Sequence, residues 1–146
     1  HDPLRRQRQM CIRDRLKNLS AGADLVLLPT TPQARSVELT VELSSILRQM
    51  DTMHAALLVK VDSRKQRLAQ EARQILEGFD VDVMQAEIPL LAAFEKAEVE
   101  GVCVSNAVDD RGRADLRRMG GWAAYCQAAV QIRDRLSAAT PDAISA

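Results

Sequence analysis

The sequence predicts a three-layer α/β/α domain, in which helices cover both faces of a mainly parallel sheet. Two observations lead to this class. Short, nearly continuous apolar runs of the kind found in buried strands alternate along the chain with segments of helical periodicity. The connections between the runs, about 15–25 residues each, are long enough for the crossovers that parallel strands require. Only three strands are expected, which is a narrow sheet for this class.

The first strand is expected over residues 24–28, where the apolar run stops at Pro29. Pro32 favours an extended conformation in the residue before it, so a helix can begin just after this proline. Ser36 is a candidate cap for that helix, which should end near Asp51.

The second strand is expected over residues 55–61, followed by a polar loop at residues 62–64. An apolar stripe at helical spacing predicts a helix over residues 67–78. Residues 81–86 alternate between apolar and polar side chains, which indicates a weaker third strand with one face or one edge in water.

Residues 88–90 are expected to form a loop, and residues 91–99 a short helix. Residues 102–104 are a candidate short extended segment, and a long final helix is expected over about residues 115–136. The Gly120–Gly121 pair weakens that helix, because each glycine costs about 1 kcal/mol relative to alanine.

The two ends of the chain differ from this pattern. Residues 1–20 are basic and lack a sustained period, and we expect a non-native or disordered segment there. The string at residues 10–15 (MCIRDR) resembles the translation of a sequencing adapter; the alternative is an ordinary solvated basic helix. Residues 21–136 then form the domain, and residues 137–146 form a flexible tail.

Composition narrows the class of protein. The chain has 146 residues and no net formal charge, which argues against a dedicated nucleic-acid coat but not against a local basic patch. Its three cysteines and two histidines indicate neither a disulfide framework nor a zinc site. No apolar run approaches the roughly 18 residues of a membrane span. Reduced cysteines and the lack of a recognisable signal peptide predict a cytoplasmic protein.

Three loops lie where an open α/β sheet binds its ligands, beyond the carboxyl ends of the strands. They cover residues 29–33, 62–65 and 88–91, and any binding site should draw on them. Taken singly, each loop has a plainer explanation. A proline after a strand usually only ends it, and Asp-Ser-Arg after a strand is usually a solvated turn or a helix cap.

Together, these segments resemble a known family. Residues 23–32 (ADLVLLPTTP) resemble the "ADLVLIPxxP" strand of ParA/MinD-type partition ATPases, and residues 58–64 (LVKVDSR) resemble the strand and D-x-R turn that follow it. Residues 87–101 (EIPLLAAFEKAEVEG) resemble the family's "xIPxxxAFxxAxxxG" stretch. The resemblance covers roughly residues 21–136 and implies a truncated half of a P-loop NTPase-like fold.

The resemblance implies a parent protein that hydrolyses ATP with Mg²⁺ and forms a homodimer around ATP. Such a protein binds DNA non-specifically and positions a plasmid, a chromosome or another cargo together with a partition partner protein. Its phosphate-binding loop lies near the N-terminus. This chain contains no GxxxxGK[ST] or KGG motif, and the "DxPP" segment that precedes the first matched strand is not found. We therefore expect a C-terminal fragment that is inactive alone.

Two other functions remain open at this point. One is a non-catalytic α/β module that binds a protein or a small ligand through the same loops. The other is a membrane-associated relative of the MinD type, which needs a basic amphipathic helix at the C-terminus; residues 137–146 are too polar to form one, so no membrane partner is expected.

The resemblance also implies where a nucleotide base would lie. Lys60 and Asp62 at one strand end, and Pro89 and Leu90 in the next loop, match positions near the adenine. Asp62 would accept a hydrogen bond from the exocyclic amine, and the backbone of Pro89 and Leu90 would line the base edge. Two residues depart from the family pattern: Leu90 stands where arginine is frequent, and Lys60 where threonine or another small residue is frequent.

Basic side chains would carry the DNA binding that the resemblance implies, through phosphate contacts that are sequence-independent and salt-sensitive. One basic cluster comprises Arg111, Arg113, Arg117 and Arg118. A second comprises Arg64, Lys65 and Arg67. The alternative for the first cluster is a solvated face, balanced by Asp109, Asp110 and Asp115.

The remaining candidate residues favour structural explanations. His54 is expected in a loop or at a helix end, and two histidines do not assemble a convincing catalytic triad. The acidic stretch over residues 77–100 suits a solvated surface, and Trp122 and Tyr125 suit a core or its rim. Because half a sheet leaves one strand edge and apolar surface uncovered, we expect self-association or poor solubility.

Overall fold

The computed structural model describes residues 3–106, 108, 111–113 and 116–139, and it confirms the α/β class. The described residues contain a sheet with the strand order β1-β2-β3, in which both neighbouring pairs are parallel. The strands are β1 (Val26–Thr30), β2 (His54–Val61) and β3 (Val83–Pro89). The helices are α1 (Pro3–Ser20), α2 (Ala34–Gln49), α3 (Gln66–Gly78), α4 (Ala92–Glu100) and α5 (Leu116–Ala139).

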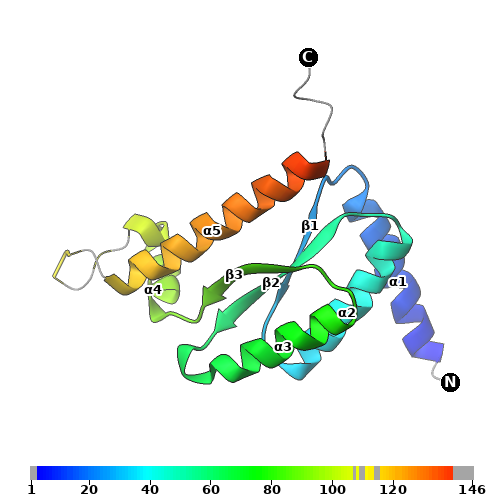
Figure 1. Ribbon diagram of the computed structural model, residues 1–146, viewed down its shortest axis with the longest axis horizontal. Coiled ribbons are helices and arrows are strands. Elements are labelled where there is room, and N and C mark those ends of the chain that lie inside the picture. Colours follow the sequence, from blue (N-terminus) through cyan, green and yellow to red (C-terminus); the bar gives the residue numbers. More distant parts are fainter. Residues whose placement is uncertain (1–2, 107, 109–110, 114–115, 140–146) are drawn as a thin grey trace, which may run out of the picture.

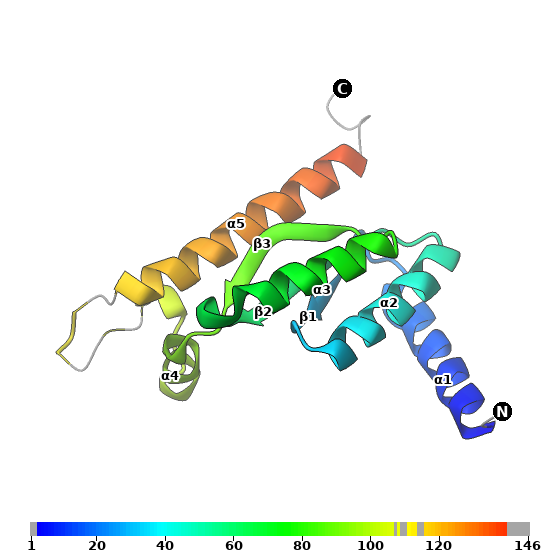
Figure 2. The same cartoon turned by 60° about the horizontal axis from the view of Figure 1, so that its bottom comes forward.

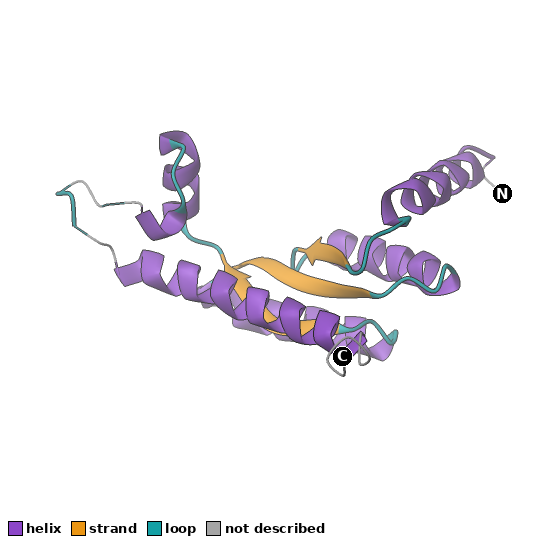
Figure 3. Ribbon diagram, turned by 90° about the horizontal axis from the view of Figure 1, so that it is seen from above, coloured by secondary structure: helices purple, strands orange, loops and turns teal. Residues whose placement is uncertain are grey.

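The sheet lies between two layers of helices (Figure 1). Successive side chains of β2 point to opposite faces, as the two-residue period of a strand requires. Ala56 and Leu58 pack into a core with residues of α2 and α3. Ala55 and Leu57 pack into a second core with Ala128 of α5. The three-layer arrangement predicted from the sequence is therefore observed, with α5 lying along one face of the sheet (Figure 3).

The first strand begins two residues later than expected and includes Pro29. The Val26 N–H donates to the Met53 carbonyl oxygen at 3.0 Å, so the backbone groups of Val26 and of alternate residues after it face β2. Pro29 is one of the residues between them and faces away from β2, where a missing N–H leaves no hydrogen bond of the ladder unmade. The expectation that Pro29 ends the strand is wrong for this reason.

The third strand was expected over residues 81–86, but it covers Val83–Pro89 and includes part of the expected loop. Its pairing with β2 is irregular. Ala56 is opposite Val83, whereas Leu58, two residues later, is opposite Glu87. Four residues of β3 therefore span the length of two residues of β2, which the local alternation of side chains does not reveal.

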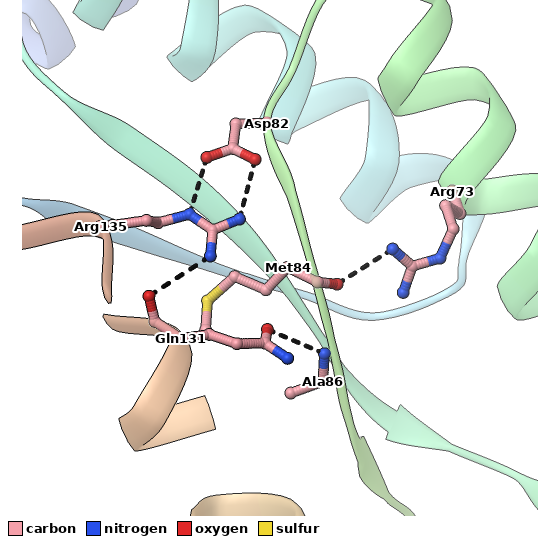
Figure 4. Close-up of polar contacts among 6 residues, drawn as sticks. All are labelled: Arg73, Asp82, Met84, Ala86, Gln131 and Arg135. Atoms are coloured by element: carbon pink, nitrogen blue, oxygen red, sulfur yellow. Dashed lines mark hydrogen bonds and ion pairs between the residues drawn. The ribbon is translucent and has the colours of Figure 1, made fainter. Parts of the chain in front are cut away.

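Side chains from both helical layers bind the backbone of β3 at this irregularity (Figure 4). Arg73 of α3 donates from Nη1 to the Met84 carbonyl oxygen at 3.0 Å. The Ala86 N–H donates to Gln131 Oε1 of α5 at 3.1 Å. Groups that the strand ladder would otherwise hold are thus satisfied by helix side chains, which a buried backbone requires.

Two smaller expectations are also corrected. Gln33, not Ser36, is the residue at the start of α2, and Ser36 Oγ accepts a hydrogen bond from the Thr31 N–H at 3.0 Å instead. A short 3₁₀ turn at Val104–Asn106 replaces the extended segment expected at residues 102–104. The start of α2 and this turn both depend on local backbone geometry, which the sequence pattern does not specify.

His54 is the first residue of β2 and not a loop or helix-end residue. Its Nδ1 lies 2.8 Å from the Thr52 carbonyl oxygen, and its Nε2 lies 2.7 Å from Ser44 Oγ of α2. Because a carbonyl oxygen only accepts, Nδ1 carries the proton in the neutral ring and Nε2 accepts from the Ser44 hydroxyl. This histidine joins α2 to the start of β2 and has a structural role.

The chain ends extend the fold at opposite sides. Residues 3–20 form helix α1, which projects away from the sheet (Figure 2), and its described side chains are exposed except for Leu16 and Ser20. Helix α5 continues through Ala139, into the segment expected to be a tail, and residues 140–146 lie outside the described part of the structure. None of the described helices combines the length and the apolar character that crossing a membrane requires.

Candidate functional site

A pocket of about 220 Å³ lies at the carboxyl ends of the strands. It draws on all three loops at which the sequence places a site. The lining residues are Thr31, Pro32, Gln33, Lys60, Asp62, Lys65, Leu68 and Leu90. This is the edge of an α/β sheet at which ligands bind, and the pocket is therefore the candidate functional site.

Three of the four predicted base-side residues, Lys60, Asp62 and Leu90, line this pocket. The fourth, Pro89, is the last residue of β3 and is not among the lining residues. The Leu90 N–H donates to the Val61 carbonyl oxygen at 2.9 Å, which fixes the start of the loop, while its side chain is half exposed. The pocket thus has one apolar wall from the third loop.

Lys60 reaches the pocket from an irregular point of β2. Leu58 is opposite Glu87 and Val61 is opposite Pro89, so β2 carries one residue more than β3 over this interval. Lys60 has a φ of 53°, in the left-handed region that residues with a side chain seldom adopt. Such strain persists where the surrounding structure imposes it, and it often accompanies functional sites.

Asp62 caps the turn that follows β2. Its Oδ1 accepts from the Arg64 N–H at 2.9 Å and from Arg64 Nε at 3.2 Å, and its Oδ2 accepts from Arg64 Nη2 at 3.3 Å. The backbone hydrogen bond from Arg64, followed by the side-chain bonds, lowers the pKa of Asp62 below its ordinary value, and Asp62 raises the pKa of Arg64. The carboxylate is thus ionised and already paired, as the plainer helix-cap interpretation of Asp-Ser-Arg predicts.

The sequence did not single out the other wall of the pocket. Lys65 was expected in one of the three loops and in a basic cluster, but not as a site residue, and Leu68 was expected only on a helix stripe. Both line the pocket, next to the 3₁₀ turn at Ser63–Lys65. Gln33 begins α2 without a side-chain cap, and the first turn of that helix contains no acidic residue. The signal that could have found them is the position of the loops next to the start of a helix.

The four arginines of the predicted DNA-binding cluster do not share one described surface. Arg111 and Arg113 are exposed, and Arg117 lies in the first turn of α5 with its side chain outside the described part of the structure. Arg118 is only 4% exposed; its Nη2 donates to the Val108 carbonyl oxygen, and its Nε and Nη1 have no hydrogen-bond partner among the described residues. The balancing residues Asp109, Asp110 and Asp115 also lie outside the described residues.

The second basic cluster is exposed but largely paired. The side chain of Arg64 is 86% exposed and binds Asp62. The side chain of Arg67 is 89% exposed and binds Glu71 one turn along α3, with Nε 2.9 Å from Oε1. Lys65, between them, faces the pocket. Of the three residues in this cluster, Lys65 is therefore the one that lines the candidate site.

Two further searches bear on function. Within the described residues, no three histidine, cysteine, aspartate or glutamate side chains converge as metal ligands. Neither the family models nor the curated proteins compared with the chain gave a match.

Proposed function

We propose that the chain is the C-terminal part of a ParA-like partition ATPase, and that its strand-end pocket forms one wall of the parent protein's nucleotide site. The observation that supports this proposal is that Lys60, Asp62 and Leu90, from two separate loops, line a single pocket. The parent would act in plasmid or chromosome partitioning or in cargo positioning, in the cytoplasm.

The residues of the pocket fit an adenine base only in part. Pro32, Leu68 and Leu90 offer apolar surface against which a base could lie. Asp62 fits less well, because Arg64 already donates to both of its carboxylate oxygens. ATP with Mg²⁺ would bring the phosphoanhydride bond that is cleaved, and the residues of this chain would bind and orient the ligand.

The proposal includes partners that the resemblance implies. The parent would form a homodimer with ATP, bind DNA non-specifically and act with a partition partner protein. In the described structure Arg111 and Arg113 are exposed, whereas the burial of Arg118 argues against a direct contact between that residue and DNA.

Hydrolysis of Mg-ATP by the purified chain tests the proposal. We expect no turnover above the protein-free rate, because the sequence has no phosphate-binding loop. Robust turnover that an Asp62→Ala substitution abolishes would contradict the proposal. The complete reading frame gives a second test: a KGG-type loop encoded about 100 or more residues before Ala23 would support it.

The second candidate function is a non-catalytic module that binds a small ligand. The pairing of Asp62 with Arg64 favours this second function, because the carboxylate has its hydrogen-bond partners without a nucleotide. A start codon just before residue 18 would favour this function over the first.

A further inference from the structure

We propose that the strand-end pocket recognises an oxyanion, a phosphate or a carboxylate group, and that Lys60 and Lys65 hold it. The inference rests on the proposed function only in taking this pocket as the ligand site, and it names the group recognised there. That group differs from the neutral base that the resemblance implies. The difference begins with Lys60, one of the two residues that depart from the family pattern.

The charges that line the pocket favour an anion. Lys60, Lys65 and Asp62 are its ionisable lining residues, and the charge of Asp62 is compensated by Arg64 through three hydrogen bonds. Lys60 and Lys65, both exposed, therefore give the lining of the pocket a net positive charge. Ammonium groups bind phosphate and carboxylate oxygens through charge-assisted hydrogen bonds, which are about twice as strong as neutral ones.

The position of Lys60 is specific. A lysine at a φ of 53° is less favourable than glycine at the same position, because its Cβ crowds the neighbouring backbone in the left-handed region. This conformation lies within the irregular pairing of β2 with β3, and Lys60 lines the pocket together with Gln33 and Pro32 of the first loop. The uncapped start of α2 at Gln33 adds positive potential from its backbone N–H groups in the same place.

The size of the pocket limits what it can take. Its volume of about 220 Å³ is below the roughly 300–1,000 Å³ of pockets that enclose drug-sized ligands. It is sized for one charged group with a small body against Leu68 and Leu90, and the rest of a nucleotide would extend beyond it. The group could belong to a free oxyanion or to the phosphate end of a nucleotide, and the two sources are separable by experiment.

Isothermal titration of the full chain at low ionic strength with inorganic phosphate, AMP and adenosine tests the inference. We expect phosphate and AMP to bind and adenosine not to bind. Lys60→Gln and Lys65→Gln should each weaken phosphate binding at least about tenfold, the size of one charge-assisted hydrogen bond. Lys60→Arg, which keeps the charge, should retain most of the affinity.

Two matched arginine variants separate the pocket from a diffuse basic surface. Arg64→Gln should weaken phosphate binding, because it leaves Asp62 uncompensated inside the pocket. Arg67→Gln removes the same charge three residues away, from a side chain that pairs with Glu71 and does not line the pocket, and it should change little. Equal losses in the two variants would overturn the inference in favour of non-specific attraction.

The comparison of the three ligands separates this inference from the proposed function. Adenosine that binds as tightly as AMP, or phosphate binding that neither lysine variant weakens, would overturn the oxyanion site while leaving a base site possible. AMP that binds no more tightly than inorganic phosphate would support the oxyanion site and remove the support for a nucleotide pocket.

Discussion

The Asp82 carboxylate, just before β3, binds the guanidinium of Arg135 on α5 through two hydrogen bonds, Nε to Oδ2 at 2.8 Å and Nη2 to Oδ1 at 2.9 Å (Figure 4). These hydrogen bonds lower the pKa of Asp82 below its ordinary value of 3.8; partial burial opposes the shift, and the charges of Arg135 and His54 add to it. A carboxylate whose pKa is lower in the folded chain than in the unfolded chain stabilises the fold at a pH above its unfolded-state pKa. This stabilisation is lost as the pH falls through the folded-state pKa.

Asp82→Asn should therefore lower the free energy of unfolding at pH 7 by about 0.5–1 kcal/mol, the upper range for a partly exposed ion pair. The deficit should shrink at a pH well below the ordinary value of 3.8, as the pH falls through the lowered pKa of Asp82 and the wild-type carboxylate becomes protonated. Urea unfolding at the two pH values measures both effects. Asp134→Asn is the control, since that carboxylate is 66% exposed and lies 3.6 Å from Arg133. A deficit that is equal at both pH values would show that the charge of Asp82 is not its source.

Lys60 allows stability and ligand recognition to be separated at one position. Lys60→Gly should raise the free energy of unfolding, by up to about 1 kcal/mol, because glycine adopts a positive φ without the cost that a side chain imposes. The same substitution should abolish the phosphate binding proposed above. Gln85→Gly, at an exposed position of β3 whose φ is negative, should instead destabilise the chain by about 1 kcal/mol. Thermal unfolding measures the stability of the two variants. A loss of stability in Lys60→Gly would contradict the inference that the backbone at Lys60 is strained.

At the scale of elements, α4 and α5 approach each other closely at Gly121. A Cβ atom there would lie 2.8 Å from Phe94 Cζ and 3.1 Å from Leu91 Cδ1. Phe94 is itself held edge-to-face against Tyr125, with ring centroids 5.6 Å apart. At Gly120, by contrast, an added Cβ would meet nothing within 4 Å. The adjacent glycines therefore have different roles in the same helix.

Gly120→Ala should stabilise the chain by up to about 1 kcal/mol through helix propensity alone. Gly121→Ala should destabilise it by about 1–3 kcal/mol, because the new methyl group forces Phe94 and Leu91 from their packing. Denaturant unfolding of the two variants is the measurement. Gly121→Ala should cost less stability in a chain that already carries Phe94→Leu than in the wild-type chain. Similar stabilisation by both alanine substitutions would contradict the close approach.

The order of the elements was predictable because apolar periodicity is a local property of the sequence. The ends of the elements were not predictable where contacts with neighbouring elements determine them. Pro29 continues β1 because it lies at a sheet edge, and β3 shifts because Arg73 and Gln131 bind its backbone. The sequence likewise could not show which of Gly120 and Gly121 faces α4.

The candidate site was predictable to the same extent. The topology rule for parallel sheets places the three loops together, and Lys60, Asp62 and Leu90 indeed line one pocket. The contribution of Lys65 and the pairing of Asp62 with Arg64 depend on the geometry of a three-residue turn, which sequence spacing does not specify.

At the scale of the whole molecule, two surfaces remain uncovered in the described part of the chain. Strand β1 pairs there only with β2, and the backbone groups of Leu27 face away from it. On α5, Met119, Trp122 and Val130 are 60%, 46% and 45% exposed. An open strand edge and an apolar helix surface are both features that favour association between copies of a chain.

We therefore expect the purified chain to self-associate, with a sedimentation coefficient that rises with concentration and with binding of a dye for apolar surface. Substituting Met119 and Trp122 together by glutamine should reduce both signals, because it removes exposed apolar area without disturbing the core on the other side of α5. Val99→Gln is the control: Val99 is 88% exposed but lies on α4 and belongs to neither β1 nor α5. A monomer that unfolds cooperatively and binds no dye would contradict the expectation. It would show that the edge of β1 and the apolar surface of α5 can stay exposed to solvent without causing association.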